Sequence, residues 1–353
     1  MSRLRINLCV TRQCNLACSY CYVPHTDRTL SKDVGLSLLD WLDANFDADF
    51  YDLILLGGEP LLKKQLLTEL IEHWRCEAQR KNKDIFISTF TNGTLLNAEN
   101  ISWLTRHIDS IAVSLDGKRS IHNRYRVYKD GSPTYDEIMR NIPPLLQAHR
   151  RVGTITVITR ELIPHLAETV AAVRAAGIKK IFYQPLFPPS EEWSDGDFAE
   201  LFRQFEMIGK EWIASQTSFA PFQMLSWHGI FHALESGELY RRKCSDRYLF
   251  VAENGDVYHC HDMEIIATSP DANLPIPDAN VLTPASPEWQ RYWQHSSSHL
   301  CHECEATRAL AGKPGIYNET IDRFYQTEYE FCKSILDRVR DRDWFTDFMQ
   351  INA

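Results

Sequence analysis

The sequence predicts an α/β fold in which an open, six-stranded barrel occupies the first half of the chain. From residue 1 to about 187, short β-branched runs alternate with longer amphipathic stretches, the order of successive βα units in a parallel sheet. Six strands with five intervening helices suit a partial barrel better than a closed eight-stranded one. At 353 residues, the chain is long enough for roughly two domains.

The expected elements follow one another along the chain. Strands are predicted at residues 4–10, 52–56, 85–91, 110–114, 154–158 and 180–185. Helices are predicted at residues 32–45, 63–81, 97–106, 135–149, 164–176, 198–215 and 321–339. We place a domain boundary near residue 215, so that residues 1–215 form a partial (β/α)6 TIM-type barrel and residues 216–353 form a second domain.

Composition excludes several functional classes. A net charge of -9 argues against a dedicated nucleic-acid binder, which usually carries a basic patch. The first apolar run is too short for a signal peptide and far too short to span a membrane, so we expect a cytoplasmic protein. In a reducing compartment, ten cysteines in spaced sets indicate metal ligands rather than disulfides.

Three cysteines follow the first expected strand directly. Cys14, Cys18 and Cys21 are spaced C-x3-C-x2-C. Three thiolates on one tight loop can hold three irons of a 4Fe-4S cube and leave the fourth iron without a protein ligand. The alternatives are a zinc knuckle or unrelated thiols, and zinc fits poorly because structural zinc is almost always four-coordinate.

This motif, with Tyr20 before the third cysteine, resembles the radical S-adenosylmethionine (SAM) family. The resemblance implies that the open iron binds the amino and carboxylate groups of SAM. The reduced cluster would then cleave SAM to a 5'-deoxyadenosyl radical, which abstracts hydrogen from a substrate. An external electron donor is therefore an expected partner.

A second motif ends the second expected strand, at Gly57, Gly58, Glu59 and Pro60. Glycines let the backbone approach a ligand closely, and a carboxylate can accept from an ammonium group. Alone, the four residues would be weak evidence for a binding site, because an ordinary turn has the same composition. The radical SAM family uses this motif to bind the amino group of SAM, and here it stands one βα unit after the cysteines.

Other strand ends supply further candidates for SAM contacts. Asn92 and Ser114 end the third and fourth strands, although Asn92 also fits a tight turn. Ser114 and Arg126 resemble SAM-contacting positions of the peptide- and sulfatase-modifying branch, and a guanidinium suits the carboxylate or ribose. Arg124 competes with Arg126, with a surface salt bridge as its alternative role. Tyr20 could stack on adenine or simply pack over the cluster.

A second cysteine set lies near the end of the chain. Cys244, Cys260, Cys301 and Cys304 supply four thiolates, enough to saturate one auxiliary 4Fe-4S cluster, or a structural zinc site. The spacing resembles the SPASM and shortened twitch domains of radical SAM enzymes, which would make the second domain an α+β auxiliary-cluster domain.

The resemblance to a full SPASM domain is incomplete. Leu310 and Pro314 stand where it has two more cysteines, so a second auxiliary cluster lacks ligands. We interpret Cys332 as a remnant or buried thiol rather than a ligand, and we interpret Cys9 and Cys76 in the same way.

The substrate is predicted from one stretch of sequence. Residues 114–138 resemble the matching stretch of peptide- and protein-modifying members, which favours a ribosomal precursor peptide and a side-chain crosslink of the cyclophane or thioether kind. The alternatives are dehydrogenation of a small-molecule alcohol or amino sugar, and a non-enzymatic electron carrier. The chain starts almost at the cluster strand, so a separate leader-binding protein is a possible partner.

A proton acceptor is expected beside the auxiliary cluster. Sulfatase-maturing relatives carry an aspartate base directly after the second auxiliary cysteine, whereas here that position is His261, followed by Asp262. This difference argues against sulfatase maturation as such. His261 or Asp262 could still take a proton, with a surface loop as the alternative.

Overall fold

The computed structural model describes residues 2–186, 192–237, 248–258 and 314–350. The described strands form one nine-stranded sheet in the order β7-β6-β5-β4-β3-β2-β1-β8-β9, and only β9 runs antiparallel to its neighbour. The strands are β1 (Arg3–Thr11), β2 (Phe50–Gly57), β3 (Asp84–Thr91), β4 (Ser110–Ser114), β5 (Val152–Ile158), β6 (Lys180–Pro185), β7 (Gln223–Met224), β8 (Tyr248–Val251) and β9 (Val257–Tyr258).

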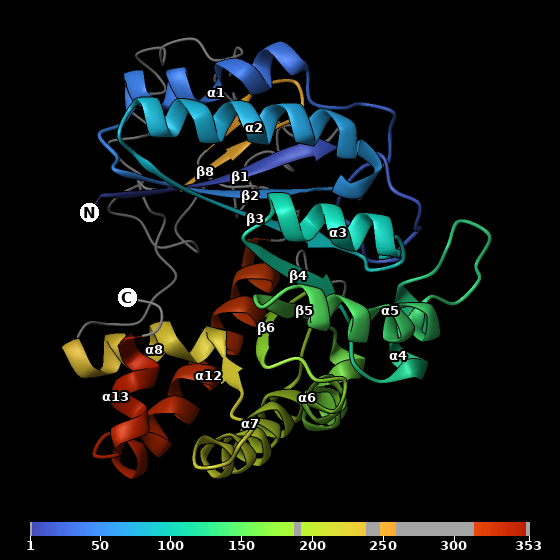
Figure 1. Ribbon diagram of the computed structural model, residues 1–353. Helices are drawn as coiled ribbons and strands as arrows, with labels where there is room; N and C mark the ends of the chain where they lie inside the picture. The colour runs from blue at the N-terminus through green and yellow to red at the C-terminus, as the bar shows by residue number, and fades with distance from the viewer. Residues whose placement is uncertain (1, 187–191, 238–247, 259–313, 351–353) are drawn as a thin grey trace.

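Helices connect the parallel strands and close the chain. They are α1 (Lys32–Asn45), α2 (Lys64–Arg80), α3 (Ala98–His107), α4 (Arg119–Tyr125), α5 (Tyr135–Ala148), α6 (Leu166–Ala175), α7 (Asp195–Gln216), α8 (Leu225–Ser236), α12 (Pro314–Val339) and α13 (Asp343–Gln350). In Figure 1, α1 and α2 lie beside β1 and β2, while α8, α12 and α13 gather together away from them.

The partial barrel predicted from the sequence is confirmed. All six expected strands are present as β1 to β6, each with ends within two residues of the prediction. The sequence reading missed α4, α8 and α13. The first of these has only seven residues, too few to show a helical period.

The two faces of the sheet differ in burial. Leu4, Ile6 and Leu8 of β1 are fully buried in the main core under the helices. On the opposite, inner face, alternate residues of β3, β4 and β6 are only half-buried. Side chains alternate between faces along a strand, so the helices cover the outer face while part of the inner face stays accessible, as expected of a barrel that does not close.

The last strands extend the sheet beyond β1. β8 pairs with β1 in parallel, with Leu8 opposite Val251. Cys9, Leu56, Phe250 and Tyr258 form a small buried cluster that joins β1 and β2 to the β8–β9 hairpin. Residues on both sides of the predicted boundary near residue 215 therefore share one sheet, and the boundary itself stays a prediction.

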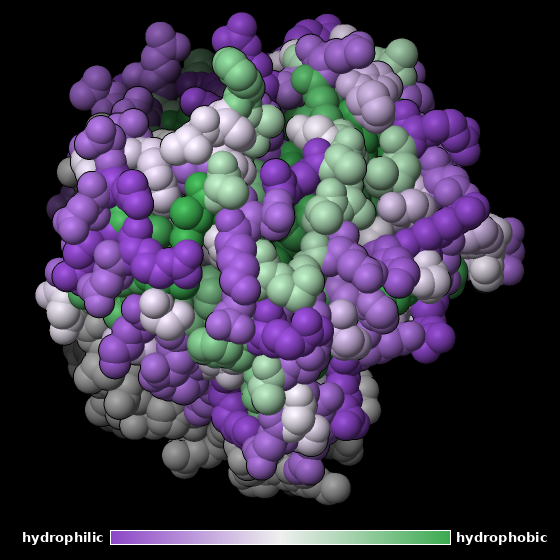
Figure 2. Space-filling model, turned by 90° about the horizontal axis from the view of Figure 1, so that it is seen from below, coloured by the Kyte–Doolittle hydropathy of each residue, from purple (hydrophilic) through white to green (hydrophobic). Residues whose placement is uncertain are grey.

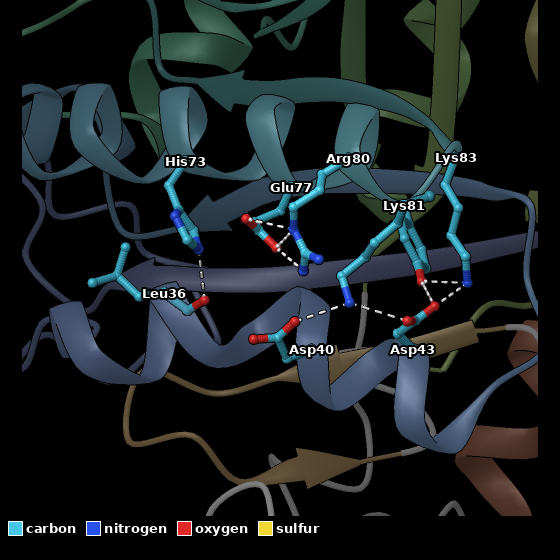
Figure 3. A network of polar contacts seen from close by, with 9 residues as sticks. Leu36, Asp40, Asp43, His73, Glu77, Arg80, Lys81 and Lys83 are labelled. Carbon is cyan, nitrogen blue, oxygen red and sulfur yellow. Dashed lines mark hydrogen bonds and ion pairs between the residues drawn. The ribbon is translucent and has the colours of Figure 1, made fainter.

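Ion pairs and a hydrogen bond connect α1 to α2 and to the residues just after α2. Lys81 bridges Asp40 and Asp43 at 2.9 and 3.0 Å, and Lys83 also bonds Asp43 (Figure 3). His73 of α2 contacts the Leu36 carbonyl oxygen at 3.0 Å. Exposed ion pairs of this kind contribute about 0–1 kcal/mol each, so apolar burial carries most of the helix packing.

One face of the molecule is mostly polar (Figure 2). On the side seen in Figure 2, hydrophilic residues predominate and apolar groups are interspersed among them. Phe219 and Met207 are among the few large exposed apolar side chains. None of the described helices is both long and apolar enough to cross a bilayer.

Candidate iron-sulfur site

The three-cysteine loop leaves the carboxyl end of β1, the edge at which parallel sheets bind ligands. Cys14 and Cys18 are half-buried and Cys21 is exposed. The loop backbone is held by a neighbouring segment: Ala17 N–H donates to the Val127 carbonyl oxygen at 2.8 Å, and Ser19 N–H donates to that of Tyr125 at 2.9 Å. These two backbone hydrogen bonds fix the loop against residues 125–127.

The chemistry of the three thiols fits an iron-sulfur cube. Burial raises the pKa values of Cys14 and Cys18, that of Cys18 to about 11. They are therefore protonated at neutral pH in the metal-free chain, and binding of metal releases their protons. Among the described residues, no three His, Cys, Asp or Glu side chains converge on one ion. In a cube each thiolate binds a different iron, so convergence on one ion is not required.

Gly57 and Gly58 bring the end of β2 against the start of this loop. Gly58 N–H donates to the Thr11 carbonyl oxygen at 2.7 Å, and Glu59 N–H donates to that of Gln13 at 2.8 Å. A Cβ on Gly58 would stand 2.1 Å from the Gln13 oxygen, and Gly57 has a φ of +127°. Gly58 is required because the backbone of β2 approaches the backbone of residues 12 and 13 closely, and Gly57 is required because other residues rarely adopt its positive φ.

Glu59 is fully buried behind the loop. Its carboxylate accepts from the N–H groups of Asn92 and Leu61, at 2.7 and 3.2 Å, and from the Thr91 hydroxyl at 3.0 Å. Burial nevertheless raises its pKa to about 7. Glu59 thus ties β2 to the end of β3, and its predicted contact with the SAM amino group stays a prediction.

Glu59 should make stability depend on pH. Its folded pKa of about 7 exceeds the usual 4.5, so the folded chain binds more protons between these values and stability falls as the pH rises through this window. At about 1.4 kcal/mol per pKa unit, the loss approaches about 3 kcal/mol. We expect Glu59→Gln to remove this component, measured as a smaller loss of unfolding free energy from pH 5 to pH 7.5 in urea titrations of metal-free protein.

A second carboxyl group serves as a built-in control for this measurement. Glu328 of α12 is also buried, and its pKa is also raised to about 7. It is present in both the original chain and the variant, so its contribution cancels in the difference. Equal pH dependence in the two proteins would show that Glu59 does not titrate in this window.

Asn92 lies directly against the cysteine loop. Its amide nitrogen is 2.9 Å from the Asn15 side-chain oxygen and 3.8 Å from the Cys14 sulfur. Its amide oxygen accepts from both the backbone N–H and the hydroxyl of Thr94. The structure therefore places Asn92 next to a cluster ligand, while its predicted contact with SAM is untested.

Tyr20 and Arg126 meet at Asp116, just after β4. The Tyr20 hydroxyl donates to the Asp116 carboxylate, and Arg126 Nε donates to it at 2.8 Å. The Arg126 guanidinium lies 5.3 Å from the centre of the Tyr20 ring, whose other close neighbour is the ring of Tyr125, also at 5.3 Å. Both candidates for SAM contacts are thus engaged with protein groups.

The remaining candidates differ in position. Ser114 ends β4 and is half-buried on the inner face of the sheet, at the same edge as the cysteine loop. Arg124 is exposed and forms an ion pair with Glu161 at 2.7 Å, the surface role given as its alternative. Cys9 and Cys332 are buried as predicted, but Cys76 is exposed. It lies outside the buried positions of α2, which include Leu70, Ile71 and Trp74.

The predicted auxiliary ligands Cys244, Cys260, Cys301 and Cys304, and the predicted bases His261 and Asp262, lie outside the described residues. The β8–β9 hairpin that precedes Cys260 is fixed to the cysteine loop by a buried ion pair. Arg12 Nε is 2.7 Å from the Glu253 carboxylate, and both side chains are almost fully buried.

A cavity of about 440 Å³ opens beside Cys14. Its wall includes Gln13, His25, Leu62 and Lys129, a mixture of polar, cationic and apolar groups. Burial and the charge of Lys129 lower the pKa of His25, so this ring is neutral at physiological pH. The cavity gives solvent a path to the cysteine loop.

The sequence reading missed the residues that support this loop. Asp116 bonds Tyr20 and Thr94 bonds Asn15, both within the loop, while Glu253 bonds Arg12 just before it. Asp116 stood inside a recognised polar run at a strand end, which was the available signal. No local pattern indicates Glu253, because its partner Arg12 lies 241 residues away.

The fold and the site together define a partial barrel that carries a loop of three cysteines at its carboxyl edge. Residues 8–173 match the Radical SAM superfamily, so the chain contains a radical SAM domain. It is an oxidative enzyme of the radical SAM type, and this class implies SAM and a 4Fe-4S cluster as cofactors.

Two relatives match the chain over more than half of its length. The chain is 28% identical over 261 residues to the uncharacterized protein MJ0907 of Methanocaldococcus jannaschii, covering 72% of this chain and 84% of that protein. It is 26% identical over 188 residues to the serine-type anaerobic sulfatase-maturating enzyme of Klebsiella aerogenes, covering 52% of this chain and 46% of the relative. The match thus spans about half the length of that relative.

Two solved structures share the fold. Native anSMEcpe with bound AdoMet superimposes with a TM-score of 0.71 at 17% identity, covering 96% of this chain and all of that one. Streptococcus suis SuiB bound to its precursor peptide SuiA gives a TM-score of 0.53 at 14% identity, covering 76% of this chain and 62% of that one.

Proposed function

We propose that this enzyme oxidatively modifies a ribosomal precursor peptide by abstracting a side-chain hydrogen, and that it forms a crosslink of the cyclophane C–C or thioether kind. The observation that carries the proposal is the similarity to sulfatase-maturating enzymes over about half of the chain. Those relatives, by name, act on a protein. Two of the solved structures that share the fold hold peptides.

The accessible inner face of the sheet supports a peptide substrate. Alternate residues of β3, β4 and β6 are half-buried there, and Phe90, Ser114 and Phe182 lie among them. This face offers both apolar and polar groups below the cysteine loop. An extended peptide could lie on it and present one side chain to the carboxyl edge of the sheet.

The cofactor supplies the radical, and the chain positions it. Cys14, Cys18 and Cys21 would hold the cluster whose open iron binds SAM. Glu59, Asn92, Ser114 and Arg126, with the glycines of the second motif, are proposed to bind SAM. Of these residues, Ser114 lies on the accessible inner face of the sheet, a position that suits direct contact with SAM.

An auxiliary 4Fe-4S cluster on Cys244, Cys260, Cys301 and Cys304 is proposed to accept the electron released when the substrate radical is oxidised. His261 or Asp262 would take the accompanying proton. The buried pair between Arg12 and Glu253 favours this arrangement, because it fixes the strand pair leading to Cys260 beside the first cysteine loop.

A small-molecule substrate is the second candidate, because one further relative favours it. The chain is 31% identical over 157 residues to the Fe-coproporphyrin III synthase of Methanosarcina barkeri, covering 36% of that relative. By its name that relative makes a small molecule, which supports a small-molecule substrate in general, and dehydrogenation of a small alcohol or amino sugar is the form of this alternative that we propose.

Co-expression with a short aromatic-bearing peptide encoded beside the gene tests the proposal. Crosslinking coupled to oxidation removes two hydrogens, so we expect the peptide mass to fall by roughly 2 Da, because the departing electrons reach an acceptor such as the auxiliary cluster. Tandem mass spectrometry then identifies the joined residues. A leader-binding protein encoded nearby is included in a parallel culture.

The control is the same peptide with a Cys18→Ala enzyme. An unchanged peptide mass in both cultures, under conditions where the original enzyme cleaves SAM, would move the assignment to the small-molecule substrate.

A further inference from the structure

Asp116 is the centre of a buried polar cluster behind the cysteine loop. Its side chain is almost fully buried and accepts from four donors. The Tyr20 hydroxyl and Arg126 Nε share one oxygen, while Arg126 Nη2, at 3.2 Å, and Val157 N–H, at 3.0 Å, share the other. Such charge-assisted, two-oxygen pairing fixes geometry as well as charge.

Two of these donors belong to, or hold, the loop itself. Tyr20 lies between Cys18 and Cys21 in the sequence. Arg126 lies between Tyr125 and Val127, whose carbonyl oxygens accept from Ser19 and Ala17. The Asp116 carboxylate therefore holds the cysteine loop in two ways. It bonds Tyr20, a side chain of the loop, and it bonds Arg126, which belongs to the segment that accepts hydrogen bonds from the loop backbone.

Thr134 and His122 form a second set of hydrogen bonds that supports Arg126 and Asp116. The Thr134 hydroxyl donates to the Arg126 carbonyl oxygen at 2.7 Å and lies 3.0 Å from Nε2 of His122. Asp116 N–H donates to Nδ1 of His122 at 3.3 Å. Because Nδ1 accepts and Nε2 donates, the imidazole is neutral, and its burial lowers its pKa to about 4.

We propose that Asp116 is the positioning residue of the first cluster: it holds Tyr20 and Arg126 so that Cys14, Cys18 and Cys21 keep the loop shape that retains iron. The proposal rests on the radical SAM assignment and not on the identity of the substrate. It gives Tyr20 and Arg126 a role in supporting the loop, in addition to the SAM contact proposed for Arg126. Supporting residues behind metal ligands commonly change metal affinity or activity by about 10–100-fold when altered.

Asp109 provides a matched control at the opposite end of β4. Its carboxylate also pairs with an arginine, Arg75 at 3.0 Å, and also accepts from a backbone N–H, that of Ile87 at 2.8 Å. Asp109→Asn therefore removes an arginine–carboxylate pair that is partly exposed, at the end of β4 opposite to the cysteine loop. The Asp116→Asn variant removes the pair behind the loop.

The experiment follows release of iron from the anaerobically reconstituted, full-length enzyme to a colorimetric chelator. We expect Asp116→Asn to speed release of the first cluster by about tenfold or more, while Asp109→Asn matches the original protein. The electron paramagnetic resonance spectrum of the reduced cluster, and its change on addition of SAM, should differ from the original only in the Asp116 variant. Equal release rates and spectra for the original and the Asp116 variant would overturn the proposal.

If Asp116→Asn does not fold, the Tyr20→Phe variant tests whether the bond between Asp116 and Tyr20 helps the loop to retain iron. It keeps the buried ion pair of Asp116 and Arg126 and removes only the hydroxyl bond. We expect unchanged circular dichroism and a faster release of iron from the first cluster. Release at the original rate would overturn the proposal. None of these readouts needs a peptide, so failure here is distinguishable from failure of the proposed function.

Discussion

Replacing Cys14, Cys18 and Cys21 together with alanine should abolish formation of 5'-deoxyadenosine and lower the iron content from about eight atoms per chain to about four. The three thiols are the proposed ligands of the first cluster, and this cluster is proposed to reduce SAM. The four distant cysteines are unaffected and should keep the auxiliary cluster. Iron analysis and chromatography of dithionite-reduced, reconstituted protein measure both quantities.

Cys76→Ala is the matched control, because Cys76 is an exposed thiol on α2. It should leave both the iron content and SAM cleavage unchanged. A triple variant that binds no iron, or that binds zinc, would contradict an auxiliary iron-sulfur cluster. A triple variant that still cleaves SAM would contradict the assignment of the first cluster.

The barrel strands could be predicted because each is a short β-branched run with a helical stretch after it. α1 was predicted with its observed bounds, since its apolar positions follow a clear helical period. β8 and β9 could not be predicted as neighbours of β1. Pairing between strands more than 200 residues apart leaves no local signal in the sequence. The alternation of strands and helices that predicted the barrel also ends near residue 187, before β8 begins.

The candidate site was predicted in outline. The cysteine loop and the Gly57–Gly58–Glu59 motif do meet at the carboxyl edge of the sheet, because parallel strands end at one edge. The partners of the polar residues could not be foreseen. The sequence shows that Arg126 could bind a ligand or an acid, but it does not show that its guanidinium lies 2.8 Å from Asp116. Glu59 likewise bonds three protein donors.

Gly58→Ala should destabilise the protein and impair cluster assembly, because the added methyl group has no room. Its Cβ would stand 2.1 Å from the Gln13 carbonyl oxygen and 3.1 Å from the Arg12 carbonyl carbon. Both are backbone atoms at the start of the cysteine loop, and the Gln13 oxygen also accepts from Glu59 N–H. Relief of the clash must move either the loop or the end of β2, whereas a clash with a flexible side chain could be relieved locally. Overpacking commonly costs about 1–3 kcal/mol, and a backbone clash belongs at or above the upper end of that range.

Gly196→Ala is the control, since Gly196 lies near the start of α7 and its Cβ would be 3.6 Å from the nearest side-chain atom. We expect Gly58→Ala to lower the thermal midpoint and the iron retained after reconstitution, and Gly196→Ala to lower neither. A Gly58→Ala protein with the original midpoint and full iron content would show that the two backbones can separate without loss of the site.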